Sequence, residues 1–192
     1  MNRLIKAVAS ALPLLFCWIP NMALAEDAPA EHLSGALGFH DTRAPVGVRW
    51  WLGGQKIGID VGFGYTSTPA PSFADEKLKA WAIEGGVPIV VKSWSKVHMI
   101  FRPGVLYQSA ESELAPPPAA FDTEKTKTLT VSGEIEGEVF IADNFSVSAS
   151  HGVAYRSIDP PGPGDKITSF TTLGNNFTEV GFHIYFFGGS GQ

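Results

Sequence analysis

The chain has 192 residues, of which 44% are hydrophobic and 17% are charged, and its formal net charge at pH 7 is −5. This acidic balance disfavours nucleic-acid binding, which requires a basic surface. The length suits one domain, and the single cysteine, Cys17, excludes a framework of disulfides within the chain.

Residues 1–25 have the pattern of a secretory signal peptide. Arg3 and Lys6 precede a short apolar stretch, and Ala23-Leu24-Ala25 supplies the small residues of a cleavage site. We therefore expect export and a single mature domain over 26–192, with a formal charge of 12 − 19 = −7 once Arg3 and Lys6 are removed. No later segment has 18 consecutive apolar residues, so a closed barrel is the membrane-spanning architecture open to the chain.

The first half of the domain alternates apolar with polar or small residues, which predicts strands near 33–40, 45–52 and 56–65. Between the second and third, Gly54-Gln55 is typical of a two-residue hairpin turn. With that turn, Arg49 pairs with Asp60, and Trp51 lies over a glycine.

A loop over 66–77 leads to strands expected near 78–91 and 96–108, although residues 75–83 would also suit a turn or two of helix. After a loop over 109–125, further strands are expected near 126–141, 145–156 and 177–187, with a tight turn at Ala142–Asn144 and a loop over 157–176. Eight strands result.

The stretch Leu129–Ile141 alternates strictly over thirteen residues, with an apolar face and an acidic face that carries Glu134, Glu136 and Glu138. Strands of soluble sheets are commonly five or six residues long. A tilted strand that crosses a bilayer needs about 9–11 residues, which this stretch satisfies.

The connections are short after strands two, four and six and long after strands three, five and seven, as in bacterial outer-membrane barrels. The last strand places Thr178, Val180, Phe182, Ile184 and Phe186 on one face, although Gly-Gly-Ser-Gly-Gln follows its aromatic end. On these features the chain resembles the small eight-stranded outer-membrane β-barrels of the OmpA/OmpX type.

The resemblance implies an all-β, eight-stranded antiparallel up-and-down transmembrane β-barrel. It also implies a porin-like protein in the outer membrane of a Gram-negative-type envelope. Its partners would then be the outer-membrane lipids and, during biogenesis, the barrel assembly machinery.

Charged residues fall on the inward parity of several strands. These candidates are Arg49, Asp60, Glu84, Arg102, Glu134, Glu136, Glu138, Arg156 and Glu179. Buried charges need partners, so we expect a structural charge network. Across the Ala142–Asn144 turn, Ile141 is expected opposite Phe145, which sets Glu138 opposite Ser148 and Glu136 opposite Ser150. Because side chains fill a barrel of this size, a packed lumen is favoured over a narrow solute conduit.

A catalytic or metal site is not expected. Ser150 and His151 are a tempting dyad, but adjacent strand residues point to opposite faces. The other histidines lack metal-ligand spacing, and no cofactor is expected. A structural or surface-interaction role is therefore favoured, with the loops 66–77, 109–125 and 157–176 as candidate extracellular contacts.

The aromatic residues suit the membrane interfaces of such a barrel. Trp50, Phe63, Tyr65, Trp81, Tyr107, Tyr155 and Phe186 share the outward parity. The alternative is a soluble, lipocalin-like periplasmic barrel, which would turn its apolar face inward around an apolar ligand.

Overall fold

The computed structural model describes residues 33–39, 43–52, 56–73, 75–113, 122–162, 164–172 and 178–188. These residues form ten strands: β1 (Leu33–Phe39), β2 (Val46–Leu52), β3 (Ile57–Pro69), β4 (Lys77–Gly86), β5 (Ile89–Trp94), β6 (Val97–Glu113), β7 (Thr123–Ala142), β8 (Phe145–Asp159), β9 (Ile167–Thr171) and β10 (Thr178–Gly188). No described segment is a helix of the length and apolarity that a membrane span requires.

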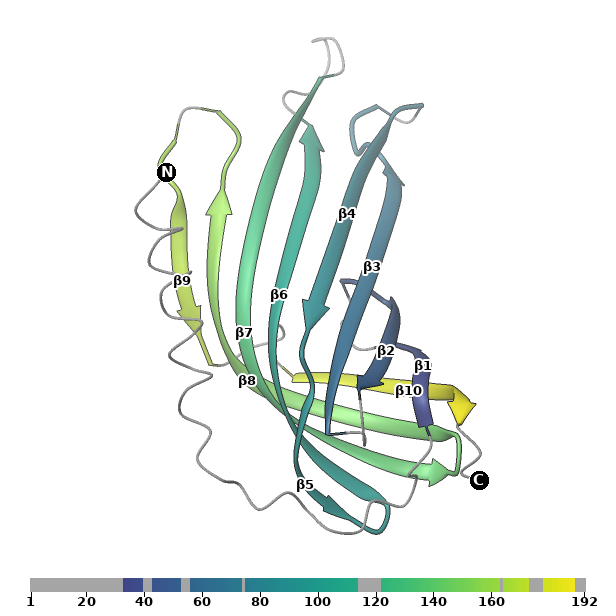
Figure 1. The fold of residues 1–192 in the computed structure, drawn as a ribbon. Helices are drawn as coiled ribbons and strands as arrows, with labels where there is room; N and C mark the ends of the chain where they lie inside the picture. The colour runs from purple at the N-terminus through teal and green to yellow at the C-terminus, as the bar shows by residue number, and fades with distance from the viewer. Residues whose placement is uncertain are drawn as a thin grey trace.

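The strands close into an antiparallel barrel with eight positions (Figure 1). Consecutive strands pair around the sheet, and β10 closes it by pairing with both β1 and β8. β5 continues the position of β4, since both lie between β3 and β6. β9 lies beside the second half of β8, while β10 pairs with the first half. The predicted all-β, eight-stranded antiparallel barrel is confirmed.

The predicted registers of two hairpins are confirmed. Arg49 pairs with Asp60 and Trp51 with Gly58 across β2 and β3. Between β7 and β8, Glu138 pairs with Ser148 and Glu136 with Ser150. The expected pairing of Ile141 with Phe145 is wrong: Ala142 takes that place, because an irregularity after Phe140 adds one residue to the strand.

The expected fourth strand is interrupted at Val87 and Pro88, which separate β4 from β5. Proline has no N–H to donate to a neighbouring strand. The backbone contacts here are irregular: Gly58 N donates to Pro88 O at 2.8 Å, and Val87 N donates to Pro103 O at 3.0 Å. The helical alternative for residues 75–83 is wrong, since β4 begins at Lys77.

Several strands run beyond the predicted ends. β3 continues to Pro69, β6 to Glu113, and β7 begins at Thr123. β9 lies inside the segment predicted as the third long loop. The upper parts of β3, β4, β6, β7, β8 and β9 therefore rise as a curved sheet above β1, β2 and β10, which lie low in the molecule (Figure 1). We call this curved sheet the upper wall.

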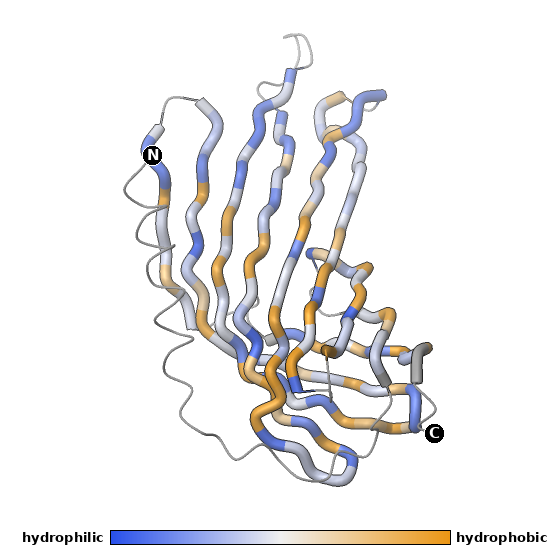
Figure 2. Tube along the Cα trace, in the orientation of Figure 1, coloured by the Kyte–Doolittle hydropathy of each residue, from blue (hydrophilic) through white to orange (hydrophobic). Residues whose placement is uncertain are grey.

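Hydrophobic and hydrophilic residues alternate along the strands (Figure 2), and exposed positions alternate with buried ones. On β3, Ile57, Ile59, Val61 and Phe63 are exposed, whereas the residues between them are buried, Asp60 included. The same alternation runs along β7 between Glu134 and Phe140. The apolar side chains thus cover the outside of the barrel, and the charges lie within it.

Candidate functional site in the barrel lumen

A buried arginine links two carboxylates from opposite sides of the lumen. Arg49, which is 1% exposed, donates from Nε and Nη2 to the two carboxylate oxygens of Asp60, both at 2.9 Å. It also donates from Nη1 and Nη2 to Glu136 at 3.0 and 2.9 Å. Both contacts are bidentate, the geometry in which a guanidinium binds a carboxylate most strongly.

A second arginine, on β6, shares the same aspartate. Arg102 Nε donates to Asp60 Oδ2 at 2.8 Å, and Arg102 Nη2 donates to Glu84 Oε1 at 2.5 Å. Its Nη1 lies 3.6 Å from Glu134 Oε1. Glu134 also accepts hydrogen bonds from Ser132 and Ser150, at 2.8 and 3.1 Å. Asp60 is therefore the point at which the two arginines meet.

Glu138 lies at the lower edge of this network. Its Oε1 accepts from Ser146 Oγ at 2.6 Å and from Tyr185 OH at 2.8 Å, and its Oε2 lies 3.6 Å from Arg49 Nη1. Two buried histidines flank it, with His183 Nδ1 at 3.3 Å and His98 Nδ1 at 3.9 Å from its oxygens. The described network thus holds five carboxylates, two guanidiniums and two imidazoles.

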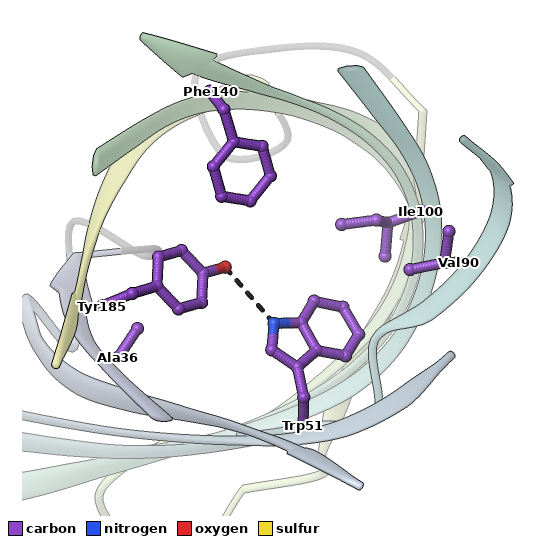
Figure 3. Packing of buried hydrophobic residues seen from close by; sticks show 6 residues of the cluster. All are labelled: Ala36, Trp51, Val90, Ile100, Phe140 and Tyr185. Carbon is purple, nitrogen blue, oxygen red and sulfur yellow. Dashed lines mark hydrogen bonds between the residues drawn. The ribbon is translucent and has the colours of Figure 1, made fainter. Parts of the chain in front are cut away.

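Below Glu138, apolar side chains cross the lumen. The cluster consists of Ala36, Trp51, Val90, Ile100, Phe140 and Tyr185. Figure 3 shows the rings of Trp51, Phe140 and Tyr185 pointing toward one another inside the ring of strands. Trp51 Nε1 donates to Tyr185 OH at 3.3 Å, which links the cluster to Glu138 through Tyr185.

Above the charges, Ala44 packs inside the barrel. Ala44 is 1% exposed and belongs to a second apolar cluster with Ala82 and Leu106. Between Ala44 and the arginines lies a cavity of about 10 Å³. A cavity of that size holds about one water molecule. The Ala44 cluster, the charge network and the Trp51–Tyr185 cluster therefore lie at three successive levels of the lumen.

The structure brings together seven of the nine predicted charges: Arg49, Asp60, Glu84, Arg102, Glu134, Glu136 and Glu138. Glu179 accepts from Nη2 of a different arginine, Arg43, at 3.4 Å. The sequence prediction did not include Arg43. Arg156 is half-buried on the upper wall, forms no ion pair among the described residues and has a buried Nε without a hydrogen-bond partner.

Other contributors were missed by sequence reasoning. His98, Ser146 and Tyr185 contact or flank Glu138, and all three lie on inward parities. Their inward parity predicts that they are buried. It does not predict that all three meet Glu138, because that depends on how the strands are staggered around the barrel.

The serine–histidine dyad is not assembled by the fold. Ser150 is buried and donates to Glu134, whereas the neighbouring His151 is exposed. Among the described residues, no group of three or more histidine, cysteine or acidic side chains has the arrangement of a metal site.

Comparisons with known proteins do not place the chain in a family. No protein-family model, no curated protein and no solved structure matches it.

Proposed function

We propose that the protein is an integral outer-membrane β-barrel with a filled polar lumen and a structural or surface-interaction role. The observation that carries this proposal is the apolar exterior of a closed barrel whose interior holds buried charges. Soluble monomers rarely expose contiguous apolar patches larger than a few hundred Å². Here exposed apolar residues cover every second position on several adjacent strands.

The height of the apolar band agrees with a bilayer. On β6, outward apolar residues run from Val97 to Tyr107. Ten residues of strand rise about 33 Å, and a tilt of about 45° reduces the vertical extent to about 23 Å. The apolar band of outer-membrane barrels is about 25 Å tall.

Aromatic side chains mark the upper limit of the band. They are Tyr65, Trp81, Tyr107, Tyr155 and Phe170, from β3, β4, β6, β8 and β9. Tyr65 pairs with Trp81, the rings of Trp81 and Tyr107 lie 5.4 Å apart, and Tyr155 pairs with Phe170. We call this set the aromatic belt. Such belts are typical of membrane–water interfaces.

The contents of the lumen favour a structural or interaction role over transport or catalysis. A solute path would have to pass both the paired arginines and the Trp51–Tyr185 layer. A soluble ligand-binding barrel would need an apolar interior, but this interior carries Arg49, Arg102 and buried glutamates. These observations disfavour a solute conduit and a soluble ligand-binding barrel.

Membrane fractionation tests the proposal. The mature chain should sediment with outer membranes, resist extraction by alkaline carbonate, and migrate faster on gels when unheated, because folded barrels resist detergent. A matched soluble periplasmic protein from the same cells serves as the control. Recovery in the soluble periplasmic fraction would contradict the proposal.

A further inference from the structure

On the outer face of the upper wall, lysines lie above the level of the aromatic belt. Along β4, exposed Lys77 and Lys79 precede Trp81 of the aromatic belt on the same face. Along β7, exposed Lys125 and Lys127 precede Leu129, which pairs with Tyr107 of that belt. Lysines on two strands, separated only by β6, therefore lie directly above the aromatic side chains. We call these four residues the lysine row.

The acidic side chains on this face do not neutralise the lysine row. β6 contributes Glu111 and Glu113 between the two pairs of lysines. Glu111 lies 3.4 Å from Lys125 and accepts from the backbone N of Lys79 at 3.1 Å. Glu113 accepts from the backbone N of Ser72 at 2.8 Å.

Among the described residues, Lys77, Lys79 and Lys127 form no ion pair with a carboxylate. Four ammonium groups thus face Glu111 and Glu113, both of which already bind backbone N–H groups. A third carboxylate, Asp159, lies opposite Lys127 and is 3.4 Å from Lys166, which adds a fifth ammonium group. The lysine row keeps a positive excess on the outer face of the wall.

We propose that the lysine row binds the phosphate groups of anionic membrane lipids that pack against the upper wall. The inference rests on the proposed membrane location. Aromatic belts lie at the level of the lipid headgroups, and a lysine just beyond them can extend its charged end to the phosphate while its stem stays on apolar surface. A basic residue near an anionic membrane surface contributes roughly a fivefold gain in binding.

The position of Trp81 makes the binding measurable. With Trp50 and Trp94 replaced by Phe, Trp81 is the tryptophan of the mature chain that faces outward, because Trp51 is buried in the lumen. Lipids with brominated acyl chains quench tryptophans that they touch. We would reconstitute this W50F/W94F chain in phosphatidylcholine vesicles and titrate in brominated phosphatidylglycerol or brominated phosphatidylcholine.

At low salt, we expect the lipid sites beside Trp81 to prefer phosphatidylglycerol over phosphatidylcholine by about fivefold or more. The ratio of Trp81 quenching by the two brominated lipids measures this preference. The triple substitution Lys77→Gln, Lys79→Gln, Lys127→Gln should bring this ratio near one. A matched control, Lys56→Gln, Lys92→Gln, Lys96→Gln, alters exposed lysines at the opposite end of the barrel and should leave the ratio at Trp81 unchanged.

An unchanged ratio in the triple variant, or equal quenching by both lipids in the parent chain, would overturn the lipid-binding inference and leave the membrane proposal intact. Competition by inorganic phosphate beyond that of chloride at equal ionic strength would overturn the assignment to membrane-held headgroups. Absence of quenching by either lipid would overturn the membrane proposal and this inference with it.

Discussion

Asp60 on β3 binds Arg49 of the neighbouring strand β2 through both carboxylate oxygens, and one of these oxygens also accepts from Arg102 on β6. The aspartate thus ties two adjacent strands to a third strand across the lumen. Removing one partner of a buried charged set is costly because it leaves the others buried and uncompensated.

We expect Asp60→Ala to lower the free energy of unfolding by about 3–5 kcal/mol. Urea unfolding of the reconstituted barrel, followed by tryptophan fluorescence, measures the change. The double substitution with Arg49→Leu should not restore stability, because Glu136 then loses a bidentate guanidinium. Arg156→Leu, which removes an arginine that has no ion pair within the described part of the chain, is the control and should cost far less. Wild-type stability of the Asp60→Ala chain would mean that the lumen is wet there.

Two adjacent glycines of β4 should differ sharply in their tolerance of a methyl group. A Cβ on inward Gly86 would lie 2.6 Å from Cζ of Arg102, whereas a Cβ on outward Gly85 would lie 4.0 Å from the nearest atom, Asp60 O. Gly86→Ala should therefore displace the Arg102 guanidinium and cost about 1–3 kcal/mol. Gly85→Ala, measured by the same urea titration, should be near neutral. Equal effects of the two substitutions would argue against the observed position of Arg102.

Single cysteines can report which face meets lipid, since the expected mature chain has none. Ile135 lies on the outward face of β7 and is 52% exposed, while Lys127 lies higher on the same face. In intact vesicles, Ile135→Cys should react with a lipid-soluble maleimide and resist a charged one. Lys127→Cys should react with the charged reagent. Rapid labelling of Ile135→Cys by the charged maleimide would place this face in water.

The proposed filling of the lumen predicts that the barrel conducts no ions. Purified protein in planar bilayers should give no steady conductance steps, because the apolar layer around Trp51 and the arginine network both obstruct the path. A large-pore porin inserted in the same bilayers is the positive control. Reproducible unitary steps that vanish on heat denaturation would contradict a permanently filled lumen.

The sequence predicted the closed barrel and two hairpin registers because alternation and turn chemistry act locally. A turn predicted at Gly54-Gln55, which lies outside the described residues, implied that Arg49 faces Asp60, and that pairing is present. The upper ends of β3, β6 and β7 were missed because they carry mainly Thr, Ser, Glu and Lys in place of an apolar face, so period-two alternation is weak there. β9 was missed for a related reason, since Pro160, Pro161 and Gly164 precede it and signalled a loop.

The contacts across the lumen could not be predicted. Glu136 meets Arg49, and Arg102 meets Asp60, between strands that are not neighbours in the sheet. Which inward residues share a level depends on the stagger of the strands around the whole barrel, and hairpin registers alone do not give it. The same gap explains why Arg156 was expected in the network although it lies higher, opposite Thr130 of the upper wall.

The pairing of β1 with β10, which is the seam of the barrel, joins residues that lie much farther apart in the chain than those of a hairpin. Phe39 pairs with Phe182, 143 positions later in the chain, whereas Glu113 of β6 pairs with Thr123 of β7 only ten positions away. By the logarithmic growth of loop-closure entropy, the seam costs about 2 kcal/mol more to bring together than that hairpin. Hairpins can therefore form in sequence order, whereas the seam can form only after β10 is present. A chain that ends before β10 would leave two unpaired edges, on β1 and on the first half of β8.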